Sequence, residues 1–138
     1  MQKVFTSGSF DPLHSGHVAF FAECAEIGEL YVGIGKDDSV TQYKHKVYQP
    51  QEERLYMVKS IKYVKDASIN PGMGFSDYVN NPMFQACDIL IINKERDCKR
   101  VRELCDRLNK VLITMDRIHA RGLPERSSTQ IRNDINNY

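Results

Sequence analysis

The chain alternates short β-rich runs with helical stretches from one end to the other, and this alternation is its strongest structural constraint. The β-rich runs are Lys3–Thr6, Leu30–Ile34, Ala67–Ile69, Ile89–Ile92 and Val111–Thr114. Strands that alternate with helices are joined most simply as βαβ units with right-handed crossovers, which place the strands parallel to one another. The sequence therefore predicts an α/β fold with a five-stranded parallel sheet.

Four stretches between these runs place apolar residues at helical spacing. They are His17–Glu26, Pro50–Val64, Phe75–Ala86 and Cys98–Leu108. Pro82 lies inside the third stretch and should interrupt that helix. No repeat or low-complexity linker divides the chain, and 138 residues are about one domain's worth. We therefore expect residues 1–138 to form a single Rossmann-like domain with helices flanking the sheet.

Composition excludes several classes of partner. The net charge is only +1, and the basic residues of the stretch Cys98–Leu108 are interrupted by Glu103 and Asp106, so we expect no nucleic-acid binding. No apolar stretch approaches the ~20 residues that span a bilayer, and the first strand begins too early to leave room for a signal peptide. The four cysteines form no CxxC pair, which favours buried thiols over a zinc site or a disulfide. The expected protein is cytoplasmic and binds no membrane.

The segment after the first strand carries two glycines, an aspartate and two histidines. Ligands of open parallel sheets bind at the carboxyl ends of the strands, where this segment lies. Gly8 allows a close backbone approach, and Gly16 opens a helix whose free N–H groups favour phosphate. His14 and His17 are three residues apart and can face the same side. Spacing alone leaves two interpretations open, an anion site or a capped turn, and offers no third ligand for a metal.

Two further segments are rich in groups that bind phosphate. Ser127 and Gln130 have the spacing of a capping box, and the hydroxyl-rich start of that helix is also a potential phosphate site. Lys44 and Lys46 follow the second strand. They are either solvated charges or cations that reach a phosphate at the same edge of the sheet.

The ten residues GSFDPLHSGH, from Gly8 to His17, resemble the signature of the HxGH nucleotidyltransferase superfamily, which includes cytidylyltransferases, phosphopantetheine adenylyltransferase and nicotinamide mononucleotide adenylyltransferases. The run Arg126–Arg132 is similar to the superfamily's motif before the last helix. The segment Lys44–Arg54 resembles the lysine loop and following helix of the glycerol-3-phosphate cytidylyltransferases. The layout is most similar to those enzymes and to the sugar-phosphate nucleotidyltransferases.

This resemblance implies that the phosphate of a small acceptor attacks the α-phosphorus of a nucleoside triphosphate and releases pyrophosphate. The implied catalytic residues bind or neutralise phosphate: His14, His17, Lys44, Lys46 and Arg126. The implied nucleotide-binding residues are Gly8, Ser9, Phe10, Gly16, His17, Arg121, Ser127, Ser128 and Thr129. The implied acceptor-binding residues are Asp11, Asp37 and Asp38. Mg²⁺ would arrive with the triphosphate, without a dedicated protein metal site, and a homodimer is expected.

The identity of the nucleotide stays open. The layout of the motifs along the chain favours CMP transfer from CTP to a glycerol-3-phosphate or sugar-phosphate type of acceptor. The alternatives are ATP-dependent adenylyl transfer, to a phosphopantetheine-, nicotinamide mononucleotide- or heptose-phosphate-like acceptor, and a non-catalytic nucleotide-binding regulatory protein. Two features depart from the glycerol-3-phosphate enzymes: the arginine of their RTEGIST run is displaced here, and Asn93-Lys94-Glu95 replaces a glycine-bearing turn after the fourth β-rich run. The acceptor pocket is expected from Asn70–Phe84 and Asn93–Lys99.

Overall fold

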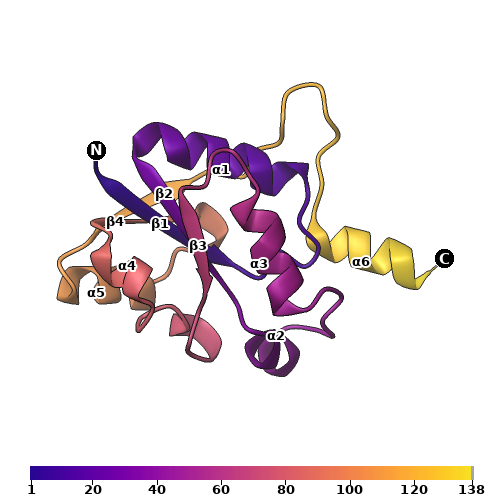
Figure 1. Cartoon of the computed structure of the whole chain (residues 1–138), viewed down its shortest axis with the longest axis horizontal. Helices are drawn as coiled ribbons and strands as arrows, with labels where there is room; N and C mark the ends of the chain where they lie inside the picture. Colours follow the sequence, from indigo (N-terminus) through magenta and orange to yellow (C-terminus); the bar gives the residue numbers. More distant parts are fainter. Residues whose placement is uncertain (138) are drawn as a thin grey trace.

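The computed structural model describes residues 1–137, and its centre is a five-stranded sheet in which every strand pair is parallel (Figure 1). The strands are β1 (Lys3–Gly8), β2 (Glu29–Ile34), β3 (Asp66–Ile69), β4 (Ile89–Asn93) and β5 (Val111–Met115). Their order in the sheet is β3-β2-β1-β4-β5. This arrangement confirms the predicted α/β fold, and each strand covers its predicted run.

The strand order reverses between β1 and β4, and the two strands separate there. The register pairs β1 with β2 from Lys3 to Gly8, whereas β1 meets β4 only at Val4 with Ile89 and Phe5 with Leu90. Beyond that point the Thr6 hydroxyl donates to the Ile91 carbonyl at 2.8 Å. A reversal of strand order leaves a crevice at the carboxyl ends of the strands, which is where open α/β sheets bind ligands.

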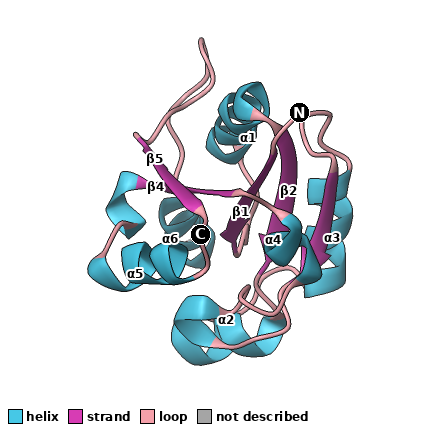
Figure 2. Cartoon of the chain, turned by 90° about the vertical axis from the view of Figure 1, so that its left-hand side faces the viewer, coloured by secondary structure: helices cyan, strands magenta, loops and turns pink. Residues whose placement is uncertain are grey.

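Helices cover both faces of the sheet (Figure 2). Neighbouring strand residues point to opposite faces, so Val4 belongs to one apolar cluster and Phe5 to the other. The first cluster packs against α1 (Ser15–Ile27) and α3 (Gln51–Lys59), and the second against α4 (Pro82–Ala86) and α5 (Lys99–Arg107). The same alternation places Ile91 in the first cluster and Ile92 in the second.

Two predicted helices are shorter than their apolar patterns suggest. The helix expected over Pro50–Val64 ends at Lys59, and Ile61 and Val64 reach the same cluster from the turn that follows. The stretch Phe75–Ala86 splits into a 3₁₀ turn, η1 (Gly74–Ser76), and α4, because Pro82 begins a new helix. The Asn81 side chain caps that helix by accepting from the Met83 N–H at 3.0 Å.

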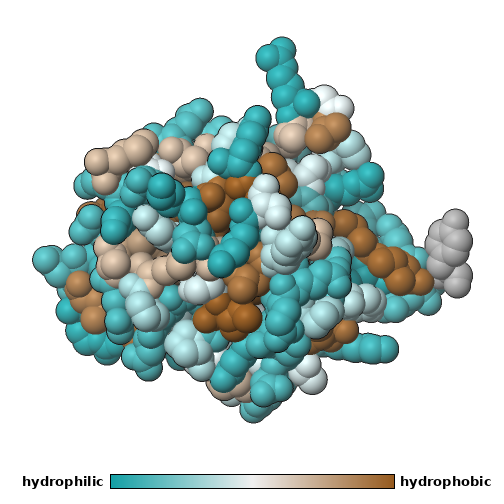
Figure 3. Space-filling model, viewed as in Figure 1, coloured by the Kyte–Doolittle hydropathy of each residue, from teal (hydrophilic) through white to brown (hydrophobic). Residues whose placement is uncertain are grey.

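Three short elements complete the carboxyl edge of the sheet. They are α2 (Asp37–Tyr43), the 3₁₀ turn η2 (Lys94–Arg96) and α6 (Ser128–Asn136). Helix α6 has no buried residue, and Figure 3 shows hydrophobic side chains on its surface, where Ile135 is 55% exposed. Across residues 1–137, every helix falls short of the length and apolar character that a membrane span requires.

Candidate active site

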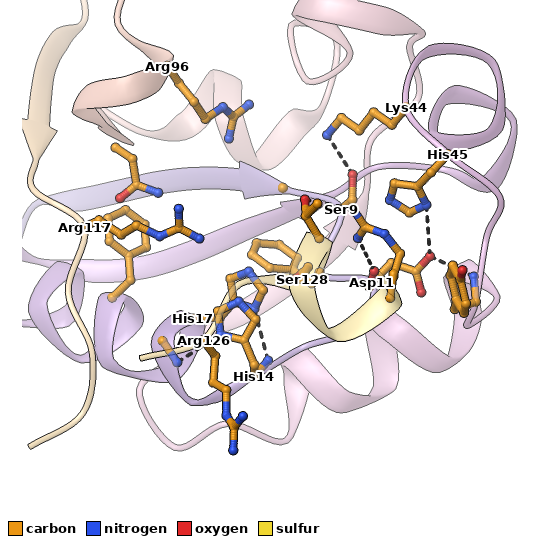
Figure 4. Close-up of a pocket in the computed structure, with 18 of the residues that line it drawn as sticks. Ser9, Asp11, His14, His17, Lys44, His45, Arg96, Arg117, Arg126 and Ser128 are labelled. Atoms are coloured by element: carbon orange, nitrogen blue, oxygen red, sulfur yellow. Dashed lines mark hydrogen bonds and ion pairs between the residues drawn. The ribbon is translucent and has the colours of Figure 1, made fainter. Parts of the chain in front are cut away.

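A cavity of about 870 Å³ lies at the carboxyl edge of the sheet, in the crevice that the strand order predicts. The segment after β1, the lysine-bearing loop after α2 and the start of α6 enclose it (Figure 4). Twelve residues that the sequence singled out line this cavity: Gly8, Ser9, Phe10, Asp11, His14, Gly16, His17, Lys44, Lys46, Arg126, Ser128 and Thr129. Three segments that are distant in the sequence therefore converge on one space.

The two histidines stack on each other at the entrance of α1. Their ring centroids are 3.7 Å apart with an angle of 25° between the planes. His14 Nδ1 accepts from the Gly16 N–H at 3.0 Å, and His17 Nδ1 accepts from the His14 N–H at 3.1 Å. An imidazole that accepts at Nδ1 carries its proton on Nε2, so both rings hold an Nε2–H donor.

Both histidines stay neutral near physiological pH. Burial lowers the pKa of His17 to about 3, with smaller contributions from His14 and Arg117. Burial also lowers the pKa of His14, assisted by the charges of Arg117 and Arg126. The pair therefore offers fixed hydrogen-bond donors to an anion without a positive charge of its own.

The aromatic ring of Phe10 supports the histidine pair, and nearby glycines make room for the rings. Phe10 packs edge-on against His17 at a centroid distance of 5.1 Å. A Cβ atom on Gly8 would lie 2.8 Å from the Phe10 ring, and one on Gly16 would lie 2.9 Å from the His14 ring. Phe10 itself has a φ of 52°, a left-handed conformation that is strained for a bulky residue. Gly8 and Gly16 therefore leave the space that the rings of Phe10 and His14 occupy.

Positive charge comes from lysine and arginine side chains around the cavity. Lys44 Nζ donates to Ser9 Oγ at 2.7 Å, and its pKa is lowered by burial and then by the charge of Arg96. Arg96 donates to the Ser7 carbonyl at 2.6 Å, and Arg132 donates to the Asp11 carbonyl at 2.7 Å. The other cations of the lining are Lys46, Arg117 and Arg126. This concentration of positive charge suits a polyanion such as a triphosphate.

Asp11 is the one acidic residue that lines the cavity within the described chain, and its carboxylate points to the lysine loop. Its two oxygens each accept at 2.8 Å, from the N–H groups of Tyr48 and Gln49. His45 Nδ1 lies 3.9 Å away, and Asp11 is only 1% exposed. These contacts fix the loop that carries Lys44 and Lys46, and the expected contact between Asp11 and the acceptor stays a prediction.

Asp37 and Asp38 lie outside the lining of this cavity, so the geometry does not support their expected role in acceptor binding. Asp37 accepts from the buried guanidinium of Arg54 at 2.7 Å, and Asp38 is exposed on α2. Arg54 also donates to the carbonyls of Gln49, Ser9 and Gly35 at 2.7 to 2.9 Å. One buried side chain thus joins α3 to the segments that follow β1 and β2.

Arg121 and Ser127 also lie outside the cavity lining. Ser127 is the N-cap of α6 and accepts from the Gln130 N–H at 3.0 Å, as its spacing predicts. Arg121 is exposed, whereas Arg126 lines the cavity. Of the two arginines considered for phosphate binding, the geometry therefore favours Arg126.

Eight further polar residues line the cavity: His45, Tyr48, Asn93, Arg96, Arg117, Arg132, Asn133 and Asn136. Asn93 and Arg96 lie in the stretch Asn93–Lys99, from which the acceptor pocket is expected, whereas Arg117, Asn133 and Asn136 belong to no segment that the sequence analysis singles out. Arg132 lies one helical turn after Ser128, and helical spacing brings both to the segment after β1, where the Ser128 hydroxyl donates to the Pro12 carbonyl at 2.8 Å. Over residues 1–137, no cluster of three or more His, Cys, Asp or Glu side chains could hold a metal ion.

Comparison with known proteins gives a family model and several similar sequences. The family model described as cytidylyltransferase-like matches residues 5–134. The FAD synthase of Methanocella paludicola is 39% identical over 70 residues, which are 50% of either chain. That of Methanosarcina mazei is 44% identical over 68 residues, 49% of this chain and 44% of the relative. The match to the FAD synthase of Methanohalophilus mahii is longer, 29% identity over 111 residues, or 80% of this chain and 75% of the relative. The chain spans about half the length of the first two relatives.

A solved structure shares the fold. The lipopolysaccharide core biosynthesis protein from Thermoplasma volcanium superposes with a TM-score of 0.70, over 86% of this chain and 98% of the other. The two sequences are 22% identical. This similarity supports the Rossmann-like architecture alone.

Proposed function

The chain belongs to the cytidylyltransferase-like family, and on this premise we propose that it transfers the AMP group of ATP to the phosphate of flavin mononucleotide. The products would be FAD and pyrophosphate. The relatives named FAD synthase favour this adenylyl transfer over the CMP transfer from CTP that the layout of the sequence suggested. CMP transfer to glycerol 3-phosphate or a sugar phosphate is therefore the second candidate.

The observation that carries the proposal is the histidine pair in a cavity that lysine and arginine side chains also line. The acceptor phosphate is largely a dianion at neutral pH, so its oxygen attacks the α-phosphorus without a protein base. The new P–O bond forms as the bond to pyrophosphate breaks, and the leaving group takes the electron pair. No side chain of the protein has to act as a nucleophile in this reaction. The protein acts by positioning the two substrates and by electrostatic stabilisation.

Each group has a separate role in this scheme. The Nε2–H groups of His14 and His17 donate to phosphate oxygens that gain charge as the leaving group departs. The surrounding cations, with Arg126 and Lys46 among them, hold the triphosphate, and Ser128 and Thr129 lie at the same wall of the cavity. We expect the triphosphate to bring Mg²⁺ with it. The carboxylate of Asp11, the acidic residue of the described cavity lining, already accepts hydrogen bonds from two backbone N–H groups at both oxygens, so it is not expected to serve as a metal ligand. Bound Mg²⁺ supplies further neutralisation of phosphate charge.

A two-nucleotide, three-acceptor assay tests the proposal. ATP or CTP is combined with flavin mononucleotide, glycerol 3-phosphate or a sugar 1-phosphate, and pyrophosphate and the nucleotide product are measured. We expect turnover with ATP and flavin mononucleotide and formation of FAD. Turnover with CTP and another acceptor would replace this proposal by the second candidate. Tight nucleotide binding without turnover on any acceptor would identify a regulatory protein.

His17→Ala should lower turnover by about 100-fold or more, the typical cost of removing one fixed donor to the transition state. His119→Ala is the matched control, because His119 is exposed and lies outside the cavity lining. Pyrophosphate release at the wild-type rate by His17→Ala would contradict the proposed role.

A further inference from the structure

A second cavity of about 350 Å³ adjoins the first on the side of α2 and η1. Five residues line both cavities: Ser7, Gly8, Ser9, Lys44 and Arg96. Two of these are cations, and Lys44 already donates to the Ser9 hydroxyl. The two spaces therefore meet at a wall that can hold a phosphate group.

The second cavity differs in chemistry from the first. Its remaining lining is largely apolar and aromatic and includes Val40, Tyr43, Phe75, Tyr78, Ile92 and Val101. Tyr43 and Phe75 are 57% and 37% exposed, which leaves aromatic surface free. The Arg100 guanidinium lies 4.2 Å from the centroid of the Phe75 ring and supports it from outside the cavity lining. A space of this size and lining favours a flat, uncharged ring system over a small polyol.

Asp77 is the one acidic side chain of this cavity among residues 1–137. Its backbone carbonyl accepts from the Gly72 N–H at 2.9 Å, which fixes its position after η1. Burial raises the pKa of Asp77, against the opposing effects of the Asn70 amide and the charges of Lys44 and Arg96. A half-buried carboxyl group beside apolar walls is stabilised by a ligand that donates a hydrogen bond to it.

Gly35 leaves open the space in front of this carboxyl group. A Cβ atom at Gly35 would lie 3.7 Å from Asp77 Oδ2 and 3.7 Å from Ser9 Oγ. Its nearest neighbour would be the Val40 side chain at 3.5 Å, an ordinary contact distance. An added methyl group therefore fits without disturbing the backbone while it occupies room between Asp77 and the shared wall.

We propose that the second cavity binds the ring of the acceptor, with Asp77 accepting a hydrogen bond from a ring N–H and with Lys44 and Arg96 holding the acceptor phosphate. This inference rests on the proposed function and makes Asp77 a determinant of acceptor specificity. The shared wall then presents the acceptor phosphate to the histidine pair in the first cavity. Phosphate monoesters that lack a ring leave the second cavity unfilled and should be poor acceptors.

Two variants and a ligand without phosphate test this inference. Asp77→Asn and Gly35→Ala are compared with wild type, with Asp106→Asn as the control, because Asp106 is an exposed carboxylate on α5. The readouts are the KM for flavin mononucleotide, the KM for ATP, the melting temperature and the fluorescence change of riboflavin on binding. Both variants should raise the KM for flavin mononucleotide by about tenfold, Asp77→Asn because a neutral amide oxygen accepts more weakly than a carboxylate, and Gly35→Ala because its methyl group fills space beside Asp77. The KM for ATP and the melting temperature should stay at the wild-type values.

The outcomes separate this inference from the proposed function. If the wild type turns over but uses glycerol 3-phosphate as efficiently as flavin mononucleotide, or if both variants keep the wild-type KM, the inference is wrong and the transferase activity stands. If no acceptor releases pyrophosphate, the proposed function fails. Riboflavin binding then decides the inference: binding that both variants weaken supports a ring site, and its absence in the wild type overturns it.

Discussion

His17 shows how a single side chain links the electrostatics of the site to the stability of the protein. Its ring is held between Phe10 and His14 and accepts a backbone N–H at Nδ1, so protonation would break a hydrogen bond and bury a charge. The pKa of His17 is about 3 in the folded chain, against an ordinary value of 6.5. Below pH 6.5 the unfolded chain therefore binds a proton that the folded chain does not.

This difference predicts a loss of stability in mild acid. The contribution of His17 is fully present above pH 6.5, falls as the pH drops toward about 3, and is worth up to about 1.4 kcal/mol per pH unit. His17→Asn keeps an acceptor for the His14 N–H and removes the titration, so its free energy of unfolding should depend less on pH. Denaturant unfolding between pH 7 and pH 4 measures this, with His119→Asn as the control. An unchanged slope in His17→Asn would show that His17 does not carry the effect.

Asp11 marks the limit of residue-level inference. It was assigned to the acceptor because it lies within the motif at the strand end, where ligands bind. Its partners are the backbone N–H groups of Tyr48 and Gln49, 37 and 38 residues away. A sequence pattern identifies an acidic residue near a site, but the direction of its carboxylate is decided by tertiary contacts that the pattern does not contain.

At the scale of the elements, Arg54 joins segments that carry the site. It leaves α3, and its donors reach the carbonyls of Ser9 and Gly35, which follow β1 and β2. The guanidinium is buried, so its removal would leave these carbonyls without their donor, and the bond to the Gly35 carbonyl is itself buried.

Arg54→Met should therefore cost about 3 kcal/mol in the free energy of unfolding, because it takes the donor from several backbone carbonyls and each buried acceptor left without a donor costs about 1–3 kcal/mol. Arg107→Met is the matched control, because Arg107 is exposed on α5. Denaturant unfolding of both variants measures the difference. Equal free energies of unfolding for Arg54→Met and Arg107→Met would show that Arg54 does not stabilise the segments that it joins.

The elements also show which parts of the fold can be read from the sequence. The strands β1, β2 and β4 were predictable because their apolar runs are buried on both faces of the sheet, whereas the edge strands β3 and β5 are only partly buried and were recognised from their short β-rich runs. Helix α2 was missed, because its sequence DDSVTQY offers Val40 as its single buried apolar residue. The motifs at the strand end, the lysine loop and the start of α6 were found because their residue types suit phosphate. Arg117 was missed because it lies shortly after β5, ahead of the Arg126–Arg132 run, in a stretch without a motif.

At the scale of the whole molecule, a chain of nearly neutral net charge gathers its positive charge in one cavity. The formal net charge is +1, yet Lys44, Arg96, Arg126 and Arg132 are among the cations that meet at the carboxyl edge of the sheet. Helix α6 brings Arg132 to this edge and is held there by polar contacts, among them that of Asn136 with the Tyr48 hydroxyl at 2.7 Å. A bound polyanion should therefore tie α6 to the rest of the chain.

The homodimer and the cytoplasmic location stay predictions. Light scattering measures the oligomeric state, and cell fractionation measures the location.

The polyphosphate, more than the base or the ribose, should supply the binding energy of the nucleotide. We expect inorganic pyrophosphate to raise the melting temperature and adenosine to leave it unchanged, because the cations and histidine donors face phosphate oxygens. At a concentration 100 times its dissociation constant, a ligand stabilises the folded state by about 2.7 kcal/mol. Thermal unfolding with pyrophosphate, adenosine and ATP measures this, and the pyrophosphate effect should weaken as salt screens the charges. Stabilisation by adenosine that equals that by ATP would contradict a phosphate-centred site and would assign the binding energy to the nucleoside.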